Sequence, residues 1–473
     1  MTVDPTQNKP ARRPRRALSE WGLPGVVLIL AVILTLFSNV LETGGGKSSA
    51  FLNMGNLVTN VATPMSWMAI MAIGATFVII TAGIDISIGS IFCVSALACC
   101  ATLQSLPPDA SPWIVLPMAI GVAAGSGLVC GLVNGLLVVS LRIHPFIVTM
   151  GTLSIFRGIT LISVPVKSLP SQGHELPGAL TDFIGYKLTL PFDWTLFGFR
   201  LVEKGTYINP VPMLIMLACV VGAWIYLEHR VGGRELFAVG GNEEAARFSG
   251  LPVARIKLRV YALSGLMGGI AGFVSAGHYG SANTATGLGY ELNVIAAAVV
   301  GGASMSGGRG SAIGAMLGAL VIKLIENGID VIQVVNLGFL KLHVSQEYGK
   351  IIIGAAIIVA VSADRLSEYL RLRRSRPSPE SDQDKQPDNG GGHESERTPR
   401  QKGGDRRMCM HGGCSRRVRQ GARAHGGRGK NTREIGNPQK NHTWARCQEP
   451  IQSGVPDGLH GRKRRGPRTG AKV

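Results

Sequence analysis

Two polar residues, Asp85 and Ser87, lie in a glycine-flanked segment, Gly83–Ser90, between long apolar runs. A carboxylate at membrane depth is energetically costly and marks a candidate functional site. The flanking glycines suggest a broken helix whose free backbone groups face a cavity, so that Asp85 and Ser87 line a polar passage. A short turn in which Asp85 caps the following helix explains the same residues equally well. The sequence leaves both interpretations open.

A second polar set lies in the segment His144–Gly158, where Pro145 fits the first turn of a helix. The polar side chains within this apolar helix are Thr149, Thr152, Ser154 and Arg157. They are suited to line a passage. Ser and Thr also bond to their own helix backbone, and an arginine can reach the membrane surface or pair structurally. For Arg157 we favour the structural role.

A glycine-dense region, Gly287–Gly310, indicates irregular backbone near a helix end, and Asn293 within it is a further candidate to line a passage. Phosphate-cradling loops continue with Gly-Lys-Ser/Thr, which is absent here. Gly44–Ser48 has that ending, but Leu41 stands where the motif needs an earlier glycine. No metal-ligand cluster or nucleophile–base pair stands out. We therefore expect no nucleotide site, metal or cofactor, and no enzymatic activity, in this chain.

The polar segment Gly240–Gly250 is prone to form a helix and lies between two apolar runs, Val211–Leu227 and Val260–Ala276. Such a segment gives a membrane protein a contact surface outside the bilayer. We expect a soluble partner to dock on it. Because the chain has no nucleotide site of its own, any ATP that drives it binds to that partner.

The apolar runs define the fold class, because stretches of roughly 15–25 residues match the length that a helix needs to cross a bilayer. Backbone amides find no water there, so these runs are helical. We predict an all-α, polytopic membrane helix bundle of about ten transmembrane helices, with broken or re-entrant segments. The predicted spans are 23–40, 60–81, 86–104, 113–140, 146–164, 211–227, 260–276, 290–304, 311–326 and 350–363. The short spans 290–304 and 311–326 also fit one re-entrant hairpin.

Parity and charge predict the orientation of the chain. An even number of spans lies on each side of the 228–259 loop, so this loop and both termini share one side. Cytoplasmic loops carry an excess of Lys and Arg. Such residues gather in this loop and after the last span, at Arg230, Arg234, Arg247, Arg255, Lys257, Arg259, Arg365, Arg371, Arg373, Arg374 and Arg376. The first apolar run, 23–40, is too long for a signal peptide. We predict cytoplasmic termini.

Small residues recur at a spacing of four inside several expected helices. The glycines are Gly127, Gly131 and Gly135, then Gly265 and Gly269, then Gly310, Gly314 and Gly318. This spacing lets helix backbones approach closely in lipid, and we interpret it as tight packing rather than as a passage. Cysteines within the apolar runs act as small hydrophobic residues and imply no disulfide framework.

Composition divides the chain into a basic N-terminus (1–20), a transmembrane domain (21–365) and a tail (366–473). The net charge is +19, but residues 1–370 hold 23 Lys and Arg against 19 Asp and Glu, whereas residues 371–473 hold 25 against 10. The positive charge is therefore mainly a property of the tail, and we expect no nucleic-acid partner. A segment so rich in Arg, Gly and polar residues cannot bury a core, so we predict disorder.

The tail has several interpretations. A polybasic segment just inside a membrane can bind anionic lipid. The spacing of Cys409, His411, Cys414 and Cys447 is too irregular for a metal site. An excess of Arg, Gly and Pro is also what an out-of-frame reading of a GC-rich gene gives, and we prefer this interpretation. The intact mass of the native protein tests it.

Taken together, four ordered segments resemble the permease subunits of bacterial ATP-binding-cassette importers of the ribose/xylose/autoinducer-2 type. These segments are Thr81–Ser90, Pro145–Gly158, Gly240–Gly250 and Gly287–Gly310. The resemblance covers roughly residues 20–365. The tail departs from it, since such permeases usually stop soon after the last helix.

The resemblance implies a protein of the bacterial plasma (inner) membrane, in which two permease subunits, identical or different, form the path for a monosaccharide or similar small polyol. An external solute-binding protein delivers the substrate. Two cytoplasmic ATPase subunits move the 240–250 coupling helix and so drive alternating access. The implied ATPase-coupling residues are Gly241, Asn242, Glu243, Glu244, Ala246 and Arg247. The candidates for the translocation path are Asp85, Ser87, Thr149, Thr152, Arg157 and Asn293.

Two alternatives remain. A related importer permease moves another solute, such as branched-chain amino acids, although the segment Thr81–Ser90 favours the sugar type. A stand-alone secondary transporter or a membrane enzyme is the other. The sequence shows one clear intramembrane acid and a docking loop that a secondary transporter does not need. No residue identifies a particular sugar.

Overall fold

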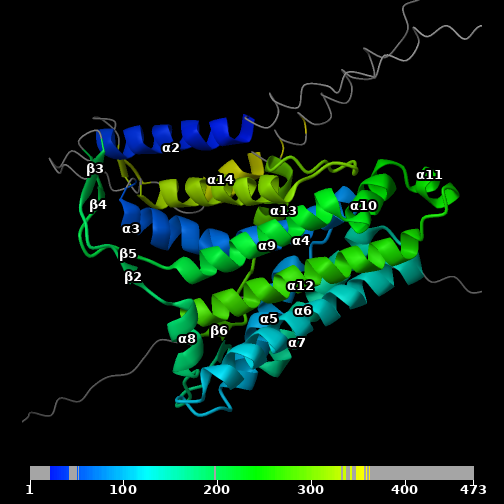
Figure 1. Ribbon diagram of the computed structural model, residues 1–473, viewed down its shortest axis with the longest axis horizontal. Helices are drawn as coiled ribbons and strands as arrows, with labels where there is room; N and C mark the ends of the chain where they lie inside the picture. The colour runs from blue at the N-terminus through cyan, green and yellow to red at the C-terminus, as the bar shows by residue number, and fades with distance from the viewer. Residues whose placement is uncertain are drawn as a thin grey trace, which may run out of the picture. The chain divides into compact units, whose positions relative to one another are not determined.

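The computed structural model describes residues 22–41, 51, 53–196, 199–331, 334–336, 341–343, 348–355, 358 and 362. The N-terminal segment 1–20 and the tail 366–473 lie outside the described residues, as do positions 356, 357, 359–361 and 363 of the expected span 350–363. The described part is mostly helical, with short two-stranded sheets in its connections. The predicted all-α helix bundle is confirmed (Figure 1).

Helices account for nearly all of the ordered elements. They are α2 (Gly22–Leu41), α3 (Met54–Asn56), the π-helix η2 (Leu57–Ala62), α4 (Thr63–Ile80), α5 (Ile88–Leu103), α6 (Pro112–Leu141), α7 (Pro145–Ser163), α8 (Gly178–Ile184), α9 (Pro210–His229), α10 (Val231–Gly241), α11 (Glu243–Phe248), α12 (Val253–Tyr279), α13 (Tyr290–Val300) and α14 (Ala312–Val331). The strands are β1 (Ser168–Leu169), β2 (Leu188–Thr189), β3 (Trp194–Leu196), β4 (Phe199–Val202), β5 (Tyr207–Ile208), β6 (Ala282–Asn283), β7 (Val334–Asn336) and β8 (Lys341–His343). They pair antiparallel as β1–β6, β2–β5, β3–β4 and β7–β8.

Among the described residues, six helical segments are long and apolar enough to cross a membrane: Met54–Ile80, α6, α7, α9, α12 and α14. Shorter apolar helices lie at Pro24–Thr35, α5 and α13. The predicted spans 60–81, 260–276 and 311–326 are too short, because the helices continue to Met54, to Val253 and Tyr279, and to Val331. Helix α14 is long enough to span the membrane by itself, so the expected spans 290–304 and 311–326 do not together form one re-entrant hairpin. Helix α13, with 11 residues, is one of the shorter apolar helices.

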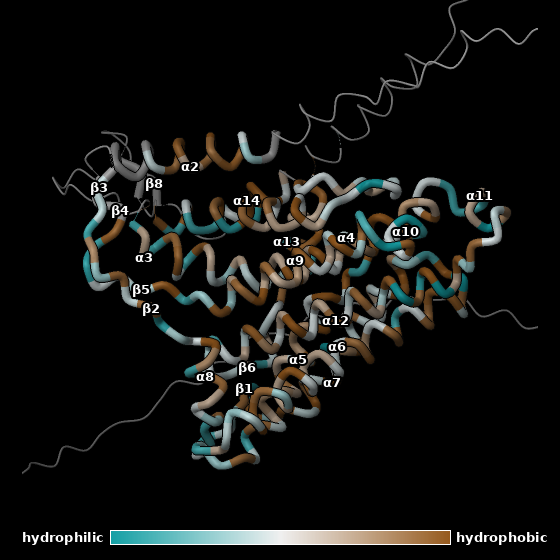
Figure 2. Tube along the Cα trace, in the orientation of Figure 1, coloured by the Kyte–Doolittle hydropathy of each residue, from teal (hydrophilic) through white to brown (hydrophobic). Residues whose placement is uncertain are grey.

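Helix α4 forms the centre of the core. In the helical segment Met54–Ile80, 94% of the most apolar window is buried, against 28% for α7 and for α9. A helix that is apolar on all sides is suited to such a central position. Helices α9, α12, α13 and α14 all pack on α4. Many leucine, isoleucine and valine residues of α6, α7 and α9 are exposed, as expected for contact with lipid. Figure 2 shows how apolar residues run along these helices.

The predicted close packing of glycine-bearing helices is confirmed between α6 and α12. A Cβ added to Gly131 would overlap the Tyr261 carbonyl oxygen, and one added to Gly265 would overlap the Gly127 carbonyl oxygen. Only glycine allows the two backbones to come this close. Helix α12 is thereby held firmly against α6, and it carries several residues of the sites described below.

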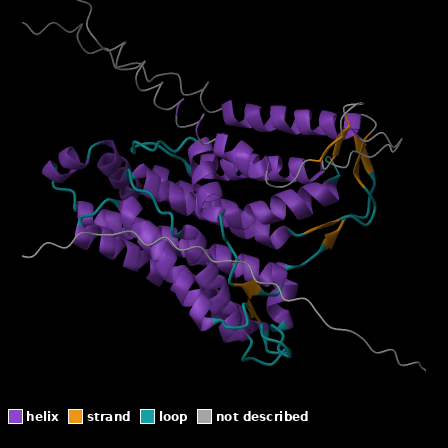
Figure 3. Ribbon diagram, turned by 180° about the vertical axis from the view of Figure 1, so that it is seen from behind, coloured by secondary structure: helices purple, strands orange, loops and turns teal. Residues whose placement is uncertain are grey.

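The two ends of the bundle differ. Helix α11 lies at one end, and the strands lie at the other end of the long helices (Figures 1 and 3). Helix α2 packs on α14, and Leu34 of α2 lies against Gly328 of α14. We refer below to the α11 end and the strand end.

Candidate functional site

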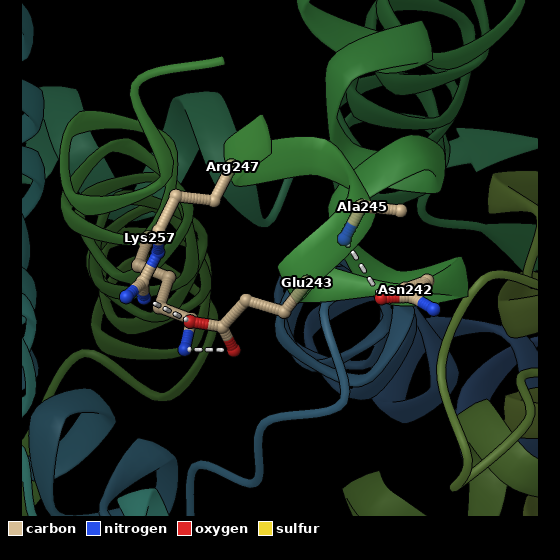
Figure 4. A network of polar contacts seen from close by, with 5 residues as sticks. All are labelled: Asn242, Glu243, Ala245, Arg247 and Lys257. Carbon is tan, nitrogen blue, oxygen red and sulfur yellow. Dashed lines mark hydrogen bonds and ion pairs between the residues drawn. The ribbon is translucent and has the colours of Figure 1, made fainter. Parts of the chain in front are cut away.

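The predicted 228–259 loop is largely helical, because α9, α10, α11 and the start of α12 fill most of it. The Asn242 side chain accepts a hydrogen bond from the Ala245 amide at 2.9 Å and so caps α11 (Figure 4). Glu243 pairs with Arg247 at 3.3 Å and with Lys257 of α12 at 2.8 Å. These contacts hold a short, polar helix in a fixed position at the α11 end.

The outer surface of α11 differs from the one expected. Ala246 is buried and packs α11 onto the core, so its predicted role in ATPase coupling stays a prediction that a direct side-chain contact does not support. Glu243 is held by its two ion pairs. Gly241, Glu244 and Arg247 are exposed, and in the described part of the chain Glu244 has no hydrogen-bond or ion-pair partner. Phe248, which the sequence prediction missed, is 90% exposed. An aromatic residue inside a polar loop was the available signal.

The turn between α4 and α5 holds Asp85 and Ser87 in a buried polar cluster. Ser87 donates to Asp85 Oδ1 from its amide at 3.0 Å and from its hydroxyl at 2.7 Å. Ser264 of α12 donates to Asp85 Oδ2 at 3.0 Å. Asn134 of α6 donates to the Ser87 hydroxyl at 2.6 Å. The carboxylate therefore orders the turn before α5 and ties it to α12, while the Ser87 hydroxyl ties the same turn to α6.

This cluster is incompletely hydrogen-bonded. Within the described residues, the side-chain oxygen of Asn134 and the hydroxyl of Tyr261 are buried and have no hydrogen-bond partner. Buried polar atoms are rarely left in this state unless water or a ligand completes them. The hydrogen bonds of the Asp85 cluster fit the local turn, one of the two interpretations that the sequence left open, and a role of Asp85 and Ser87 in lining a passage stays a prediction.

Thr149 of α7 is hydrogen-bonded to the same turn. Its hydroxyl accepts from the Ile86 amide at 3.2 Å and donates to the Ile84 carbonyl at 3.1 Å. Thr152 is also buried and donates to the Thr149 carbonyl of its own helix at 3.2 Å. The structure therefore brings Thr149 together with the Asp85 cluster, whereas Thr152 makes only a bond within α7.

Arg157 lies apart from this cluster and connects α7 to the connection between α12 and α13. Its guanidinium donates to the Thr284 carbonyl at 3.0 Å and to the Thr286 carbonyl at 2.9 Å. These backbone contacts match the structural role that the sequence analysis favoured for this residue.

Asn293 belongs to a second polar cluster, on α13 and α14. It donates to Glu326 at 2.9 Å, and Lys323 pairs with the other oxygen of Glu326 at 2.6 Å. The Lys323 ammonium also lies 5.5 Å from the centre of the Tyr290 ring. The expectation of one clear intramembrane acid is wrong, because Glu326 is carried by a spanning helix. Lys323 and Glu326 were visible in the sequence as charges inside an apolar run.

Replacing Glu326 with alanine will leave the Lys323 ammonium without its counter-charge in a spanning helix. Because Glu326 is itself part-exposed, we expect a loss of about 2 to 3 kcal/mol of stability. Thermal unfolding of the purified protein in nanodiscs measures it. The double variant Lys323→Leu/Glu326→Leu should recover most of the loss. A double variant as unstable as Glu326→Ala would contradict the pairing argument.

A polar pocket of about 590 Å³ opens at the strand end. It is lined by Asn53, Gly55, Asn56, Thr59, Asn60 and the residues 203–207 of the connection between β4 and β5. The π-helical turn η2 forms part of its wall, and such turns are frequent at functional sites. Asn56 and Asn327 of α14 exchange hydrogen bonds at 2.9 and 3.0 Å, which fixes this wall to the core.

The long apolar helices, their exposed apolar faces and the short polar helix α11 at one end define a membrane-embedded protein. A family model described as the permease component of branched-chain amino acid transport systems matches residues 57–361, so the chain belongs to this family. This match leaves the tail outside. It confirms the predicted resemblance to importer permeases.

Several curated relatives are sugar permeases by name. The chain is 33% identical to the ribose import permease protein of Bacillus subtilis (strain 168), over 72% of this chain and 91% of the relative. It is 32% identical to the D-allose transport system permease protein of Escherichia coli (strain K12), over 73% and 92%. It is 33% identical to the galactose/methyl galactoside import permease protein of the same strain, over 75% and 96%. No solved structure matches the chain significantly.

Proposed function

We propose that this chain is the permease subunit of an ATP-driven importer and forms the translocation path for a monosaccharide or similar small polyol. The relatives named for ribose, allose and galactose support the sugar class. The observation that carries the proposal is α11. It is short, capped and braced by Lys257, and it presents Glu244 and Phe248 outward at one end of the bundle.

In this proposal, the α11 end is cytoplasmic and two ATPase subunits bind there. The permease pairs with a second permease, and an external solute-binding protein delivers the substrate at the strand end. ATP-driven movement of α11 switches the bundle between outward-open and inward-open states. The plasma membrane is the site of action, with both termini of the chain in the cytoplasm.

The polar pocket at the strand end is the proposed entrance. Amide and hydroxyl side chains such as Asn53, Thr59, Asn60 and Thr206 can both donate to and accept from sugar hydroxyls. We place the Asp85 cluster farther along the proposed translocation path. The side-chain oxygen of Asn134 and the hydroxyl of Tyr261 lack a hydrogen-bond partner among the described residues, and water or a hydroxylated substrate can supply one.

Reconstitution tests the proposal. The permease is placed in proteoliposomes with the ATPase that co-purifies with it and a solute-binding protein, and is supplied with radiolabelled ribose, allose or galactose. We expect ATP-dependent uptake of at least one of these sugars. Uptake that proceeds without any ATPase would instead support a stand-alone transporter.

The family description favours one second candidate, a permease for branched-chain amino acids. Radiolabelled leucine in the same proteoliposomes distinguishes it. Uptake of leucine without uptake of any sugar would replace the sugar proposal.

An Asn60→Ala variant should raise the KM for sugar severalfold and leave kcat close to normal, because the loss of one hydrogen-bonding side chain costs about 1 kcal/mol. Asn60 is exposed, so the fold should tolerate the change. Uptake as a function of sugar concentration measures the effect. The exposed Asp109, outside the pocket, supplies the control Asp109→Ala. An unchanged KM for Asn60→Ala would remove the pocket from the path.

A further inference from the structure

Three glycines form a backbone junction between the end of α10 and the end of α4. Gly240, in the last turn of α10, packs so closely on α4 that a Cβ added to it would overlap the Ile80 carbonyl oxygen. The same Cβ would lie 2.6 Å from the Gly308 amide nitrogen. That amide donates to the Ile80 carbonyl at 2.8 Å. We call Gly240, Ile80, Gly307 and Gly308 the glycine junction.

Gly307 and Gly308, in the loop between α13 and α14, form the third part of the junction. Both have positive φ angles, of 85° and 72°, which favour glycine. A Cβ on Gly307 would lie 2.6 Å from the Gly240 carbonyl oxygen and 2.9 Å from Ala82 Cβ. The backbones of α10, of the end of α4 and of the loop with Gly307 and Gly308 therefore contact one another directly, with no flexible side chain between them.

The position of the junction in the chain connects the two sites described above. Gly240 precedes the Asn242 cap of α11 by two residues. On the other side, Ile80 ends α4 and leads within five residues to Asp85. Asp85 and the adjoining Ile84 and Ile86 are in turn bonded to Ser264 of α12 and Thr149 of α7. A continuous series of short contacts thus runs from α11 to the buried polar cluster.

We propose that the glycine junction transmits the movement of α11 to α4 and the Asp85 turn, so that ATPase action reaches the translocation path through backbone contacts. This inference rests on the proposed function of α11. Close-packed backbone deforms little, and a displacement of α10 therefore moves Ile80 and the turn with it. Gly240, Gly307 and Gly308 are positioning residues that touch neither ATP nor substrate.

A glycine of the preceding helix provides a matched control. Gly222 lies in α9, and a Cβ added to it meets no atom within 4 Å. Ala is a better helix former than Gly in both positions. Gly240→Ala and Gly222→Ala therefore differ mainly in whether the new methyl group meets the backbone of a neighbouring element.

We expect Gly240→Ala to retain the bound ATPase and its ATP hydrolysis but to lower sugar uptake about tenfold, so that far more ATP is hydrolysed per sugar imported. Gly222→Ala should match the wild type in both quantities. Equal coupling ratios in the two variants would overturn the proposal. A wild type that imports no sugar would instead contradict the proposed function, so the two failures are distinguishable.

A second experiment leaves the junction unchanged and still tests the proposal if the Gly240→Ala permease does not assemble with its ATPase. It measures a distance across the junction. Spin labels are attached to unnatural ketone residues at the exposed positions Arg234, on α10, and Ser306, on the two sides of the junction. Electron–electron resonance then gives their separation with and without vanadate-trapped nucleotide in the assembled importer. An unchanged separation is expected for elements that move together. A separation that changes on trapping would overturn the proposal.

Discussion

A Phe248→Asp variant will keep its fold and lose at least about tenfold in affinity for the ATPase subunit. Burying one phenylalanine side chain stabilises a complex by about 1.5 to 3 kcal/mol, and an aspartate in the same pocket must also be desolvated. Phe248 is 90% exposed at the end of α11, so the change removes no packing from the permease itself. Co-purification of the ATPase with tagged permease, followed by titration in nanodiscs, measures the loss.

Two controls make this result specific. Phe248→Leu keeps an apolar side chain and should retain most of the affinity. Leu288, which is 68% exposed and follows the α12 end that lies away from α11, gives Leu288→Asp as a matched change outside the docking surface. If Phe248→Asp and Leu288→Asp bind the ATPase equally well, α11 does not dock through Phe248.

The charges on α11 call for separate variants. Glu243 is bonded to both Arg247 and Lys257, and an arginine at this position would place three positive charges together. The effect of Glu243→Arg on partner binding would then be mixed with damage to the helix. Glu244 makes no such contact within the described residues, so Glu244→Arg tests partner binding alone.

The positions of the spanning helices could be predicted from hydropathy, but several of their ends could not. The predicted span 60–81 misses the first turns because Asn56 and Asn60 lower the hydropathy there, although the helix already begins at Met54. The span 260–276 begins late because Arg255, Lys257 and Arg259 are typical of a loop. Helix α12 starts at Val253, since a helix can extend beyond the apolar layer when its charges face water or pair, as Lys257 does.

Several contacts within the polar clusters could not be predicted from the sequence, because their residues lie far apart along the chain. Asp85 and Ser264 are separated by 179 positions, and Asn56 and Asn327 by 271, so spacing along the chain cannot pair them. The exposure of Phe248 and the burial of Ala246, two residues apart, likewise depend on how α11 lies on α12. The Lys323–Glu326 pair was different, because an i, i+3 pair of opposite charges in an apolar helix can be recognised from sequence.

Asp85→Ala will destabilise the protein by about 3 to 5 kcal/mol, because three donors lose their acceptor in a buried site. These donors are the amide and hydroxyl of Ser87 and the hydroxyl of Ser264. Asp85→Asn should cost far less. Its amide oxygen can still accept from Ser87, and its NH₂ group can donate to Ser264, whose hydroxyl then turns to accept. Thermal unfolding in nanodiscs measures both changes.

Transport by Asp85→Asn then separates the roles of shape and charge at this site. The carboxylate receives hydrogen bonds from side chains and backbone, and no ion pair involves it among the described residues. If its task is to order the turn that receives motion from the glycine junction, Asp85→Asn will import sugar at nearly the wild-type rate. A well-folded Asp85→Asn protein that cannot import would show that the negative charge itself is required. Asp85 would then act on the substrate or on a bound cation, since a neutral isostere preserves every hydrogen bond that orders the turn.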